Sequence, residues 1–511
     1  MPRYAAIDIG SNSVRMQAAE VAPDQPVRVL ASDREVTRLG ESVYRTGRIG
    51  REAASFTCSV LERMAARYRS LDVAGVRAVA TSSVRDARNQ DEFLALASSA
   101  AGIPVEVISG REEARLVQLG VQSRWPQPPD GRVLILDIGG GSAELIASRN
   151  GHMLDAVSKP LGAVRLREVF LASDPPTPDQ LHRMDAYIGE KLDGAPRRLG
   201  AGGWLRCIAT SATASAVASA VGGVARERRD DADRLRVPAP RVRALLRRLG
   251  TMDLAARRKV RGIGPRRAEI IVPGVAVLAR VLQTFGLRSF YYSAAGVRDG
   301  IIADLAARGV GKERAQLTSD QAKEVQRLSR RYGVPAGHAR KVAELARELF
   351  HTFQPIHGLP MESGRLLEAA AWLHDVGHYI SDASHHKHSY YVVSNSDLPG
   401  FTGPERELIA NLCRYHRKSL PAPHHEGLKS LDQQQERTLK LLLPLLRLAD
   451  GLDRSHRQPV RSIRCQIRDG GVTIRLDSSD GIELEIWAAQ QAAEIFQQVY
   501  GRPLVAVREG G

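Results

Sequence analysis

The residues best suited to chemistry follow an apolar run near position 135. The run Val133–Leu136 ends in Asp137, and a glycine-rich turn with a hydroxyl and a second acid follows: Gly139, Gly140, Gly141, Ser142 and Glu144. The apolar run predicts a buried strand, and the glycines end it because they favour turns and positive φ. A glycine-rich turn after a strand exposes backbone N–H groups that bind phosphate oxygens. Asp137, at the strand end, can hold a divalent cation directly or through water.

The same pattern occurs at the start of the chain. An apolar run ends in Asp8, and the turn after it contains Gly10, Ser11, Asn12 and Ser13. After each turn the chain is apolar again, over residues 14–21 and 145–147. One copy alone would favour an ordinary tight hairpin beside an acid. Two copies indicate an internally duplicated fold, in which two hairpins face each other and bind phosphate from both walls of a cleft.

A third set of polar residues follows a short predicted strand at residues 75–80. Segment 81–89 offers hydroxyls and Arg85, whose planar guanidinium can bind a phosphate through two parallel hydrogen bonds. The alternative is a helix capped by Ser82 or Ser83 that carries a surface arginine. Without further information, the alternative is favoured for this segment.

Two adjacent acids follow the predicted strand at residues 105–108. Glu112 and Glu113 lie in the first turn of a helix that begins near Ser109 or Gly110. Acids there complement the helix dipole. Near the phosphate loops, one of them could instead act as a general base that takes a proton from an attacking water. The residue pattern does not choose between Glu112 and Glu113.

Length and composition limit the number of domains, the class of partner and the compartment of the protein. A chain of 511 residues is too long for one core and predicts three or four domains. The net charge of +16 indicates a polyanionic partner, although an arginine-rich genome could also produce it. The cysteines are scattered, which predicts reduced thiols and a cytoplasmic protein. Neither a signal peptide nor a membrane span is predicted from the sequence.

Four motifs in this order resemble the exopolyphosphatase/guanosine pentaphosphate phosphohydrolase family. They are Asp-Ile-Gly-Ser-Asn-Ser (8–13), Ala-Thr-Ser-Ser-Val-Arg-Asp-Ala (80–87), Ile-Ser-Gly-Arg-Glu-Glu-Ala-Arg-Leu (108–116) and Leu-Asp-Ile-Gly-Gly-Gly-Ser-Ala-Glu-Leu (136–145). The resemblance implies duplicated ribonuclease-H-like domains of the actin/hexokinase/Hsp70 superfamily. It implies hydrolysis of a terminal phosphoanhydride of polyphosphate, or of the 5′-γ-phosphate of pppGpp, with Mg²⁺. It assigns the water-activating role to Glu113, phosphate binding to Arg85, and metal binding to Asp8, Asp137 and Glu144.

The second half of the duplication contains further phosphate-binding candidates. Segment 207–213 occupies the place of the family's glycine-rich segment, and it keeps the hydroxyls of Ser211 and Thr213. Residues 226–267 are rich in arginine, including Arg257, Arg258, Arg261, Arg266 and Arg267. These arginines form either a solvated helical face or a track for a polyanion, and the track is slightly favoured.

Residues 321–455 predict a bundle of helices that carries a separate set of histidines and acids. The set resembles the metal ligands of an HD domain, with His388 and His416 matching the extra histidines of two-metal variants: His338, His374, Asp375, His388, His416 and Asp450. Imidazole with carboxylate suits Mn, Fe, Zn or Ni. The alternative is an HD-like domain that only binds substrate and packs in a dimer. Metal binding is favoured and a second catalytic activity is not, while His385, His386, His424 and His425 are predicted to be loop residues without a role.

Together these patterns predict an α/β protein with an all-α HD-like domain and a small α/β C-terminal domain. The expected domains are residues 1–125, 126–304, 305–455 and 456–511, with a joint at residues 126–131. In the last domain, strands are expected at residues 461–467, 472–476 and 482–487, before a helix at 488–499.

The predicted function is that of a Mg²⁺-dependent exopolyphosphatase, a homodimer by resemblance, with inorganic polyphosphate as its partner and without a membrane or a specific nucleic acid. The alternatives are pppGpp hydrolysis at the same site, an ATP-dependent sugar kinase, and a non-catalytic sensor of polyphosphate or alarmone.

Overall fold

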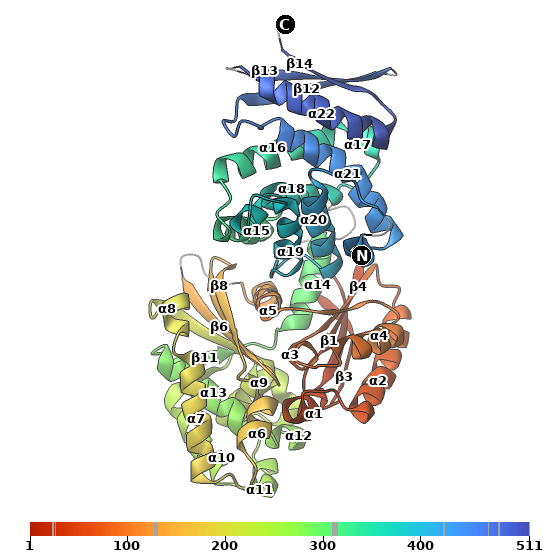
Figure 1. The fold of residues 1–511 in the computed structure, drawn as a ribbon. Helices are drawn as coiled ribbons and strands as arrows, with labels where there is room; N and C mark the ends of the chain where they lie inside the picture. The colour runs from red at the N-terminus through yellow and green to blue at the C-terminus, as the bar shows by residue number, and fades with distance from the viewer. Residues whose placement is uncertain are drawn as a thin grey trace. The chain divides into compact units, whose positions relative to one another are not determined.

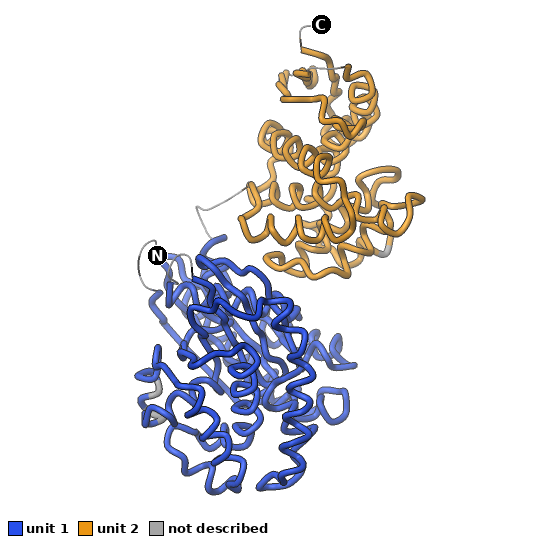
Figure 2. The backbone as a smooth tube through the Cα atoms, turned by 90° about the vertical axis from the view of Figure 1, so that its left-hand side faces the viewer, with its two compact units in different colours: residues 1–310 blue, residues 311–511 orange. Residues whose placement is uncertain are grey.

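The computed structural model describes residues 1–22, 25, 27–126, 131–308, 315–422, 425–468, 470–478 and 481–509. The chain forms two compact units, residues 1–310 and 311–511 (Figure 2). Residues 127–130, most of the predicted joint, lie outside the described part, as does His424. The boundary predicted at residue 304 falls within the last helix of the first unit, which ends at Arg308. The finer division into four domains stays a prediction.

The first half of unit 1 is a five-stranded sheet with the order β3-β2-β1-β4-β5. β2 is antiparallel to β1 and β3, whereas β1, β4 and β5 run parallel. The strands are β1 Arg3–Ile9, β2 Val14–Glu20, β3 Arg28–Glu35, β4 Gly75–Ala80 and β5 Val105–Val107. The helices are α1 Leu39–Thr46, α2 Arg51–Arg69, α3 Ser82–Arg85, α4 Gln90–Ala101 and α5 Gly110–Arg124.

The second half is a six-stranded sheet with the order β10-β11-β9-β6-β7-β8. Its strands are β6 Arg132–Ile138, β7 Ala143–Arg149, β8 His152–Lys159, β9 Trp204–Thr210, β10 Arg236–Pro238 and β11 Ser289–Tyr292. Its helices are α6 Ala163–Phe170, α7 Pro178–Leu192, α8 Ala195–Leu199, α9 Ser211–Gly222, the 3₁₀ helix η1 Arg226–Ala232, α10 Ala239–Gly250, α11 Leu254–Arg258, α12 Pro265–Ala268, α13 Ile271–Thr284 and α14 Val297–Arg308. The order β8-β7-β6-β9 repeats β3-β2-β1-β4 with the same strand directions, as expected for a duplicated fold. The predicted mixed α/β class is confirmed.

The two halves share a core around α5 and α14, which lie between the sheets (Figure 1). Alternate residues of β1 face α2 and α4 on one side and α5 and α14 on the other, so the strand is buried on both faces. β6 is buried in the same way, which explains its uninterrupted apolar run. This packing fixes α5, the helix that carries Glu113, between the two predicted phosphate loops.

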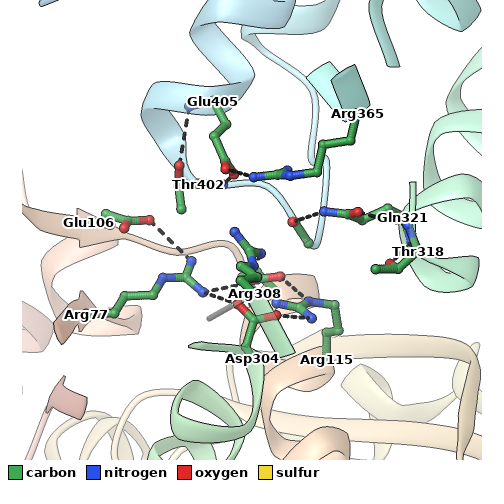
Figure 3. A network of polar contacts seen from close by, with 12 residues as sticks. Arg77, Glu106, Arg115, Asp304, Arg308, Thr318, Gln321, Arg365, Thr402 and Glu405 are labelled. Atoms are coloured by element: carbon green, nitrogen blue, oxygen red, sulfur yellow. Dashed lines mark hydrogen bonds and ion pairs between the residues drawn. The ribbon is translucent and has the colours of Figure 1, made fainter. Parts of the chain in front are cut away.

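A buried network of charges joins α5 and α14 to the first sheet (Figure 3). Arg115 of α5 donates to Asp304 of α14 at 3.0 Å, and Arg77 of β4 contacts Asp304 at 3.5 Å and Glu106 at 3.2 Å. Arg308 lies 3.0 Å from the same aspartate. These cations outweigh the effect of burial and lower the pKa of Asp304 below its usual range.

We expect Asp304→Asn to lower the free energy of unfolding by about 3–5 kcal/mol at pH 7, because it leaves buried arginines without their carboxylate. The folded-state pKa of Asp304 lies below its unfolded value of about 3.9. The ionised carboxylate therefore contributes its full stabilisation of the folded state above the unfolded pKa. This contribution is lost as the pH falls from the unfolded pKa toward the folded pKa. Urea denaturation of the full chain between pH 7 and pH 3 should show the difference between wild type and variant shrinking below pH ~4.

The matched control is Asp179→Asn, since Asp179 is exposed and pairs with Arg183 on its own helix at the surface. It should change stability by less than about 0.5 kcal/mol. Equal effects of the two substitutions would contradict the role given to the network.

Unit 2 begins with helices and ends with a small sheet. The helices are α15 Ser319–Arg331, α16 Ala336–Thr352, α17 Gln354–His357, α18 Ser363–Leu373, η2 Val376–Tyr379, α19 His385–Ser394, α20 Gly403–Tyr415, η3 Glu426–Leu428 and α21 Gln433–Gly451. The remaining elements are β12 Val460–Arg468, β13 Gly471–Ser478, α22 Glu483–Tyr500 and β14 Leu504–Arg508, with the strand order β12-β13-β14. One hydrophobic core runs from the helices into this sheet. The HD-like assignment of the helices stays a prediction.

The expected strand at residues 482–487 is wrong. This segment is the start of α22, and the third strand is β14, which the sequence pattern did not indicate. Ile482, Glu485 and Ala489 are buried while Leu484 and Trp487 are exposed, so the buried positions follow a helical spacing. An alternation over only six residues is too short to distinguish the two-residue period of a strand from the 3.6-residue period of a helix.

Candidate active site

The two predicted phosphate loops have the same local structure. In the turn between β1 and β2, the N–H of Gly10 donates to the carbonyl of Ser13 at 3.1 Å, and between β6 and β7 the N–H of Gly139 donates to Ser142 at 3.0 Å. Asp8 faces Arg15 across the first hairpin, as Asp137 faces Glu144 across the second. Asp8 and Asp137 therefore occupy equivalent positions in the two halves.

Both loops line one pocket of about 70 Å³. The predicted residues around it are Asp8, Gly10, Ser11, Asn12, Ser13, Glu113, Asp137, Gly139, Gly140, Gly141, Ser142 and Ser211. The loops approach closely, since a Cβ on Gly140 would lie 2.9 Å from the Ser11 Cβ and 3.2 Å from the Asn12 nitrogen. Residues of both predicted loops therefore lie around one pocket.

Glu112 and Glu113 point to different surroundings. Ser109 caps α5 by accepting the N–H of Glu112 at 3.2 Å, which places both acids in the first turn. The Glu112 carboxylate accepts from Arg115 at 2.7 Å and belongs to the buried charge network. Glu113 lines the pocket, and its Oε2 lies 3.7 Å from Nη2 of Arg85. Glu113 is therefore the acid that faces the phosphate loops.

Buried carboxyl groups converge on this pocket. Burial raises the pKa of Asp137 to about 6 and that of Glu144 to about 7. Burial and the charge of Glu144 raise the pKa of Glu113 well above its usual range, and burial also raises the pKa of Asp8. Within the described residues, Oε2 of Glu113, Oδ1 of Asp137 and Oε2 of Glu144 are buried without a hydrogen-bond partner. Unpartnered carboxylate oxygens fit a hard divalent cation such as Mg²⁺.

Three predicted residues, Arg85, Glu144 and Thr213, are not part of the lining of the pocket. Nη2 of Arg85 lies 3.7 Å from Oε2 of Glu113, which lines the pocket. Nη1 of Arg85 donates to the carbonyl of Ile108. The Glu144 carboxylate accepts a hydrogen bond from the Ser158 hydroxyl at 2.8 Å. Its negative charge raises the pKa of Glu113. Thr213 is buried on α9, where a Cβ on Gly274 would lie 2.7 Å from its Cγ2, so it packs against α13 instead.

A larger cavity of about 720 Å³ shares Asp8, Asp137 and Ser211 with the small pocket. Arginines from both halves line it: Arg15, Arg34, Arg124, Arg266, Arg267 and Arg298. Burial together with the charge of Arg15 lowers the pKa of Arg267 and Arg298 to about 10. Positive charge that lowers the pKa of neighbouring cations favours binding of an anion.

The predicted arginine track is only partly at this cavity. Arg257 forms an ion pair with Asp174, and Arg258 lies 3.2 Å from Glu269, so both serve the local fold. Arg266 and Arg267 line the cavity. The sequence did not single out Arg15, although its place opposite Asp8 in the hairpin corresponds to that of Glu144.

A second set of residues that the sequence did not indicate ties the loops together. The Tyr44 hydroxyl lies 2.8 Å from the Ser11 hydroxyl, and Arg165 donates to the carbonyl of Gly141 at 2.8 Å. The guanidinium of Arg165 also lies over the Tyr44 ring, 4.2 Å from its centroid. Tyr44 and Arg165 thereby connect a loop of each half.

The histidines predicted as ligands in unit 2 lie in three overlapping groups, each with ligand atoms within 4.8 Å of one another. The groups are His338, His374 and Asp450; His338, Asp375 and His456; and Asp375, His385 and His416. In the described residues, His388 belongs to none of these groups, whereas His385 of the same helix belongs to one. Both are on α19, not in a loop; His385 and Ser389 share its buried face, one turn apart, whereas His388 is partly exposed.

Comparison with known proteins gives consistent matches. Residues 18–308 match the Ppx/GppA phosphatase family, and residues 321–486 match Ppx/GppA phosphatase, domain III. A guanosine-5'-triphosphate,3'-diphosphate pyrophosphatase of Aeromonas hydrophila is 27% identical over 413 residues, 80% of each chain. An exopolyphosphatase-like protein of known structure is 30% identical, with a TM-score of 0.56 over 59% of this chain and 97% of the other. The Aquifex aeolicus PPX-GPPA enzyme is 27% identical, with a TM-score of 0.52 over 59% and 99%.

Proposed function

The chain belongs to the Ppx/GppA phosphatase family, and from this premise we propose that it is an exopolyphosphatase that releases terminal orthophosphate from inorganic polyphosphate. The observation that carries the proposal is a pair of cavities in unit 1 that share lining residues. The small pocket has room for little more than one phosphate group between the loops, and the larger, arginine-lined cavity can take the anionic chain behind it. An extended polyanion would occupy both cavities.

In this proposal the terminal phosphate binds between the loops, where backbone N–H groups and Arg85 neutralise its oxygens. Glu113 accepts a proton from the attacking water. Its raised pKa makes the ionised carboxylate a stronger base than that of an exposed glutamate. The water oxygen bonds to phosphorus while the anhydride P–O bond breaks, and the shortened chain leaves. Mg²⁺, held by Asp8, Asp137 and Glu144, would supply positive charge to the phosphoryl oxygens.

The second candidate is hydrolysis of pppGpp at the same site, in keeping with the name of the Aeromonas relative. Phosphate release should be measured from long-chain polyphosphate and from pppGpp side by side, with and without Mg²⁺. Faster release from polyphosphate supports the proposal, and release from pppGpp alone replaces it with the second candidate. Tight binding of both without phosphate release would indicate a sensor, and transfer of phosphate to a sugar would indicate a kinase.

The larger cavity predicts a salt dependence that differs between the substrates. Rising salt should weaken the binding of long-chain polyphosphate more than the binding of pppGpp, because more arginine–phosphate contacts are screened in the longer substrate. Arg266→Gln should raise KM for long polyphosphate roughly threefold to tenfold by removing one charged contact, with kcat unchanged. Steady-state kinetics at several salt concentrations measures both. Arg258→Gln is the matched control, since Arg258 pairs with Glu269 outside the cavity; equal KM changes in the two variants would refute the role of the cavity.

The assembly and location of the protein also stay proposals. None of the helices in the described part of the chain is long and apolar enough to cross a membrane. We propose a cytoplasmic homodimer, as the family resemblance implies. Light scattering on the purified chain of 55.8 kDa tests the dimer, because a monomer mass would contradict it.

A further inference from the structure

Three consecutive carbonyls of the loop Gly139–Ser142 are bound by residues of α6. The carbonyls of Gly139 and Gly140 accept backbone N–H groups from the first turn of that helix, at 3.0 and 2.9 Å. The carbonyl of Gly141 accepts from a side chain instead, since Nε of Arg165 donates to it at 2.8 Å. Of these three contacts, only the last is made by a group that a substitution can remove.

The direction of each carbonyl also fixes the direction of the next N–H. A peptide is planar and trans, so its C=O and its N–H point to opposite sides. The N–H groups of Gly140, Gly141 and Ser142 therefore point away from α6. The small pocket is lined by these three residues and, among the residues that the structure describes, by none from α6. In the same described residues the N–H of Ser142 has no acceptor, so it is free to donate to a bound phosphate.

The guanidinium of Arg165 is held in place by the other half of unit 1. Its Nη2 donates to the Ser82 hydroxyl at 3.1 Å and forms an ion pair with Asp86. Its carbon lies over the Tyr44 ring, 4.2 Å from the centroid, which is within the range of a cation–π interaction. Only 20% of the Arg165 side chain is exposed. These contacts leave the guanidinium little freedom to turn away from the Gly141 carbonyl.

Tyr44 extends the connection to the first predicted phosphate loop. Its ring packs against the start of α6, and its hydroxyl lies 2.8 Å from the Ser11 hydroxyl. The fit is close, because a Cβ on Gly141 would overlap the Tyr44 hydroxyl and lie 2.7 Å from Oγ of Ser11. Arg165 and Tyr44 therefore hold Ser11 and the Gly141 peptide in fixed positions relative to each other.

A simple link between the two halves would explain these contacts without any effect on the reaction. Other side chains of the same helix already provide such links. Glu168 of α6 pairs with Arg45 of α1 at 3.2 Å, and Arg167 lies 3.9 Å from Glu41. The halves are thus joined without Arg165, and what depends on Arg165 is the direction of one peptide.

We propose that Arg165 is a positioning residue for phosphoryl transfer, which turns the Ser142 N–H toward the terminal phosphate of the substrate. The inference rests on the phosphatase function proposed for unit 1. Negative charge is spread over the phosphoryl oxygens in the transition state, and a preorganised N–H stabilises that charge without having to reorient. Because the N–H meets the terminal phosphate alone, hydrolysis of polyphosphate and of pppGpp should depend on Arg165 equally. Arg165 itself touches neither the substrate nor the attacking water.

Arg165→Gln tests this role by removing the guanidinium. With either substrate, kcat should fall roughly tenfold to a hundredfold while KM changes less than about threefold, since the lost orientation matters most in the transition state. Steady-state kinetics at saturating Mg²⁺ measures both. Arg167→Gln is the matched control, because it makes the same chemical change two residues later on the same helix. Its kcat should stay within about twofold of wild type, since Arg167 forms only partly exposed ion pairs.

Arg165→Lys separates the orientation of the peptide from the charge. Lysine keeps a cation beside Asp86, but one nitrogen cannot replace the fork that contacts Gly141, Ser82 and Asp86 together. We therefore expect kcat to fall as in Arg165→Gln, and circular dichroism of both variants checks folding. Full kcat in Arg165→Lys would mean that the charge, and not the direction of the peptide, is what the reaction needs.

Binding of orthovanadate tests the same peptide without turnover. Vanadate is a phosphate analogue that can become five-coordinate, as phosphorus does during transfer. Its Kd, measured by isothermal titration calorimetry with Mg²⁺, should rise roughly tenfold or more in Arg165→Gln and stay unchanged in Arg167→Gln. If the wild type hydrolyses neither substrate, the function proposed for unit 1 fails, and vanadate binding still decides whether Arg165 orients the loop.

Four results would overturn the role of Arg165. They are an unchanged kcat in Arg165→Gln, a rise in KM alone, an unchanged Kd for vanadate, and equal losses in Arg165→Gln and Arg167→Gln. The last result would show that Arg165 only joins the two halves. A wild type that neither hydrolyses the two substrates nor binds vanadate would overturn this role together with the function proposed for unit 1.

Discussion

Glu113→Gln is expected to lower the rate of phosphate release by roughly 10²- to 10⁴-fold, the contribution of a positioned general base. Glutamine keeps the size of the side chain but cannot accept a proton from the attacking water. The loops and the arginine-lined cavity remain, so polyphosphate binding should change little. Single-turnover phosphate release and equilibrium binding of long-chain polyphosphate, measured on the same preparation, separate the two effects.

Glu112→Gln is the matched control, because it makes the same chemical change one residue earlier on the same helix. Glu112 accepts hydrogen bonds from Arg115 and Arg77 inside the charge network. Its variant should therefore lose thermal stability and keep its turnover at temperatures where it is folded. If Glu112→Gln stopped turnover and Glu113→Gln did not, the assignment of the base would be reversed.

The loops and the cleft could be predicted because they depend on local sequence. A strand that ends in an acid and a glycine-rich turn has few alternatives, and its repetition at Asp8 and Asp137 indicated the duplication. The choice between Glu112 and Glu113 could not be made from local pattern, since adjacent residues of one helical turn have the same neighbours in sequence. It follows from the packing of α5 between the sheets, where Arg77 and Asp304 come from distant parts of the chain.

Residues whose role depends on tertiary contacts were missed for the same reason. Arg15 and Arg298 are far apart in the sequence and meet in one cavity. In unit 2, His385, His386 and His388 lie within four residues of one another, and the packing of α19 decides that His385 is buried while His388 is partly exposed. Short-range pattern also failed at α22, where packing against the core decides between helix and strand.

The predicted phosphate loop of the second half is held by the start of α6, and this contact predicts a large effect at a residue outside the pocket. The N–H groups of Ala163 and Val164 donate to the carbonyls of Gly139 and Gly140 at 3.0 and 2.9 Å. Gly162 caps this helix with φ −73° and ψ 149°, a conformation open to any residue. A Cβ there would overlap the backbone of Gly140 and Gly141.

Gly162→Ala should therefore displace the loop without straining its own backbone. Displacement of a phosphate-binding group by about 1 Å can cost roughly 10²-fold in rate, and overpacking costs about 1–3 kcal/mol of stability. Steady-state kinetics and thermal denaturation measure the two losses. Gly194→Ala, at the start of α8, is the control because a Cβ there meets no atom within 4 Å. If Gly162→Ala kept full kcat despite the overlap, the position of the Gly139–Ser142 loop would not control phosphoryl transfer.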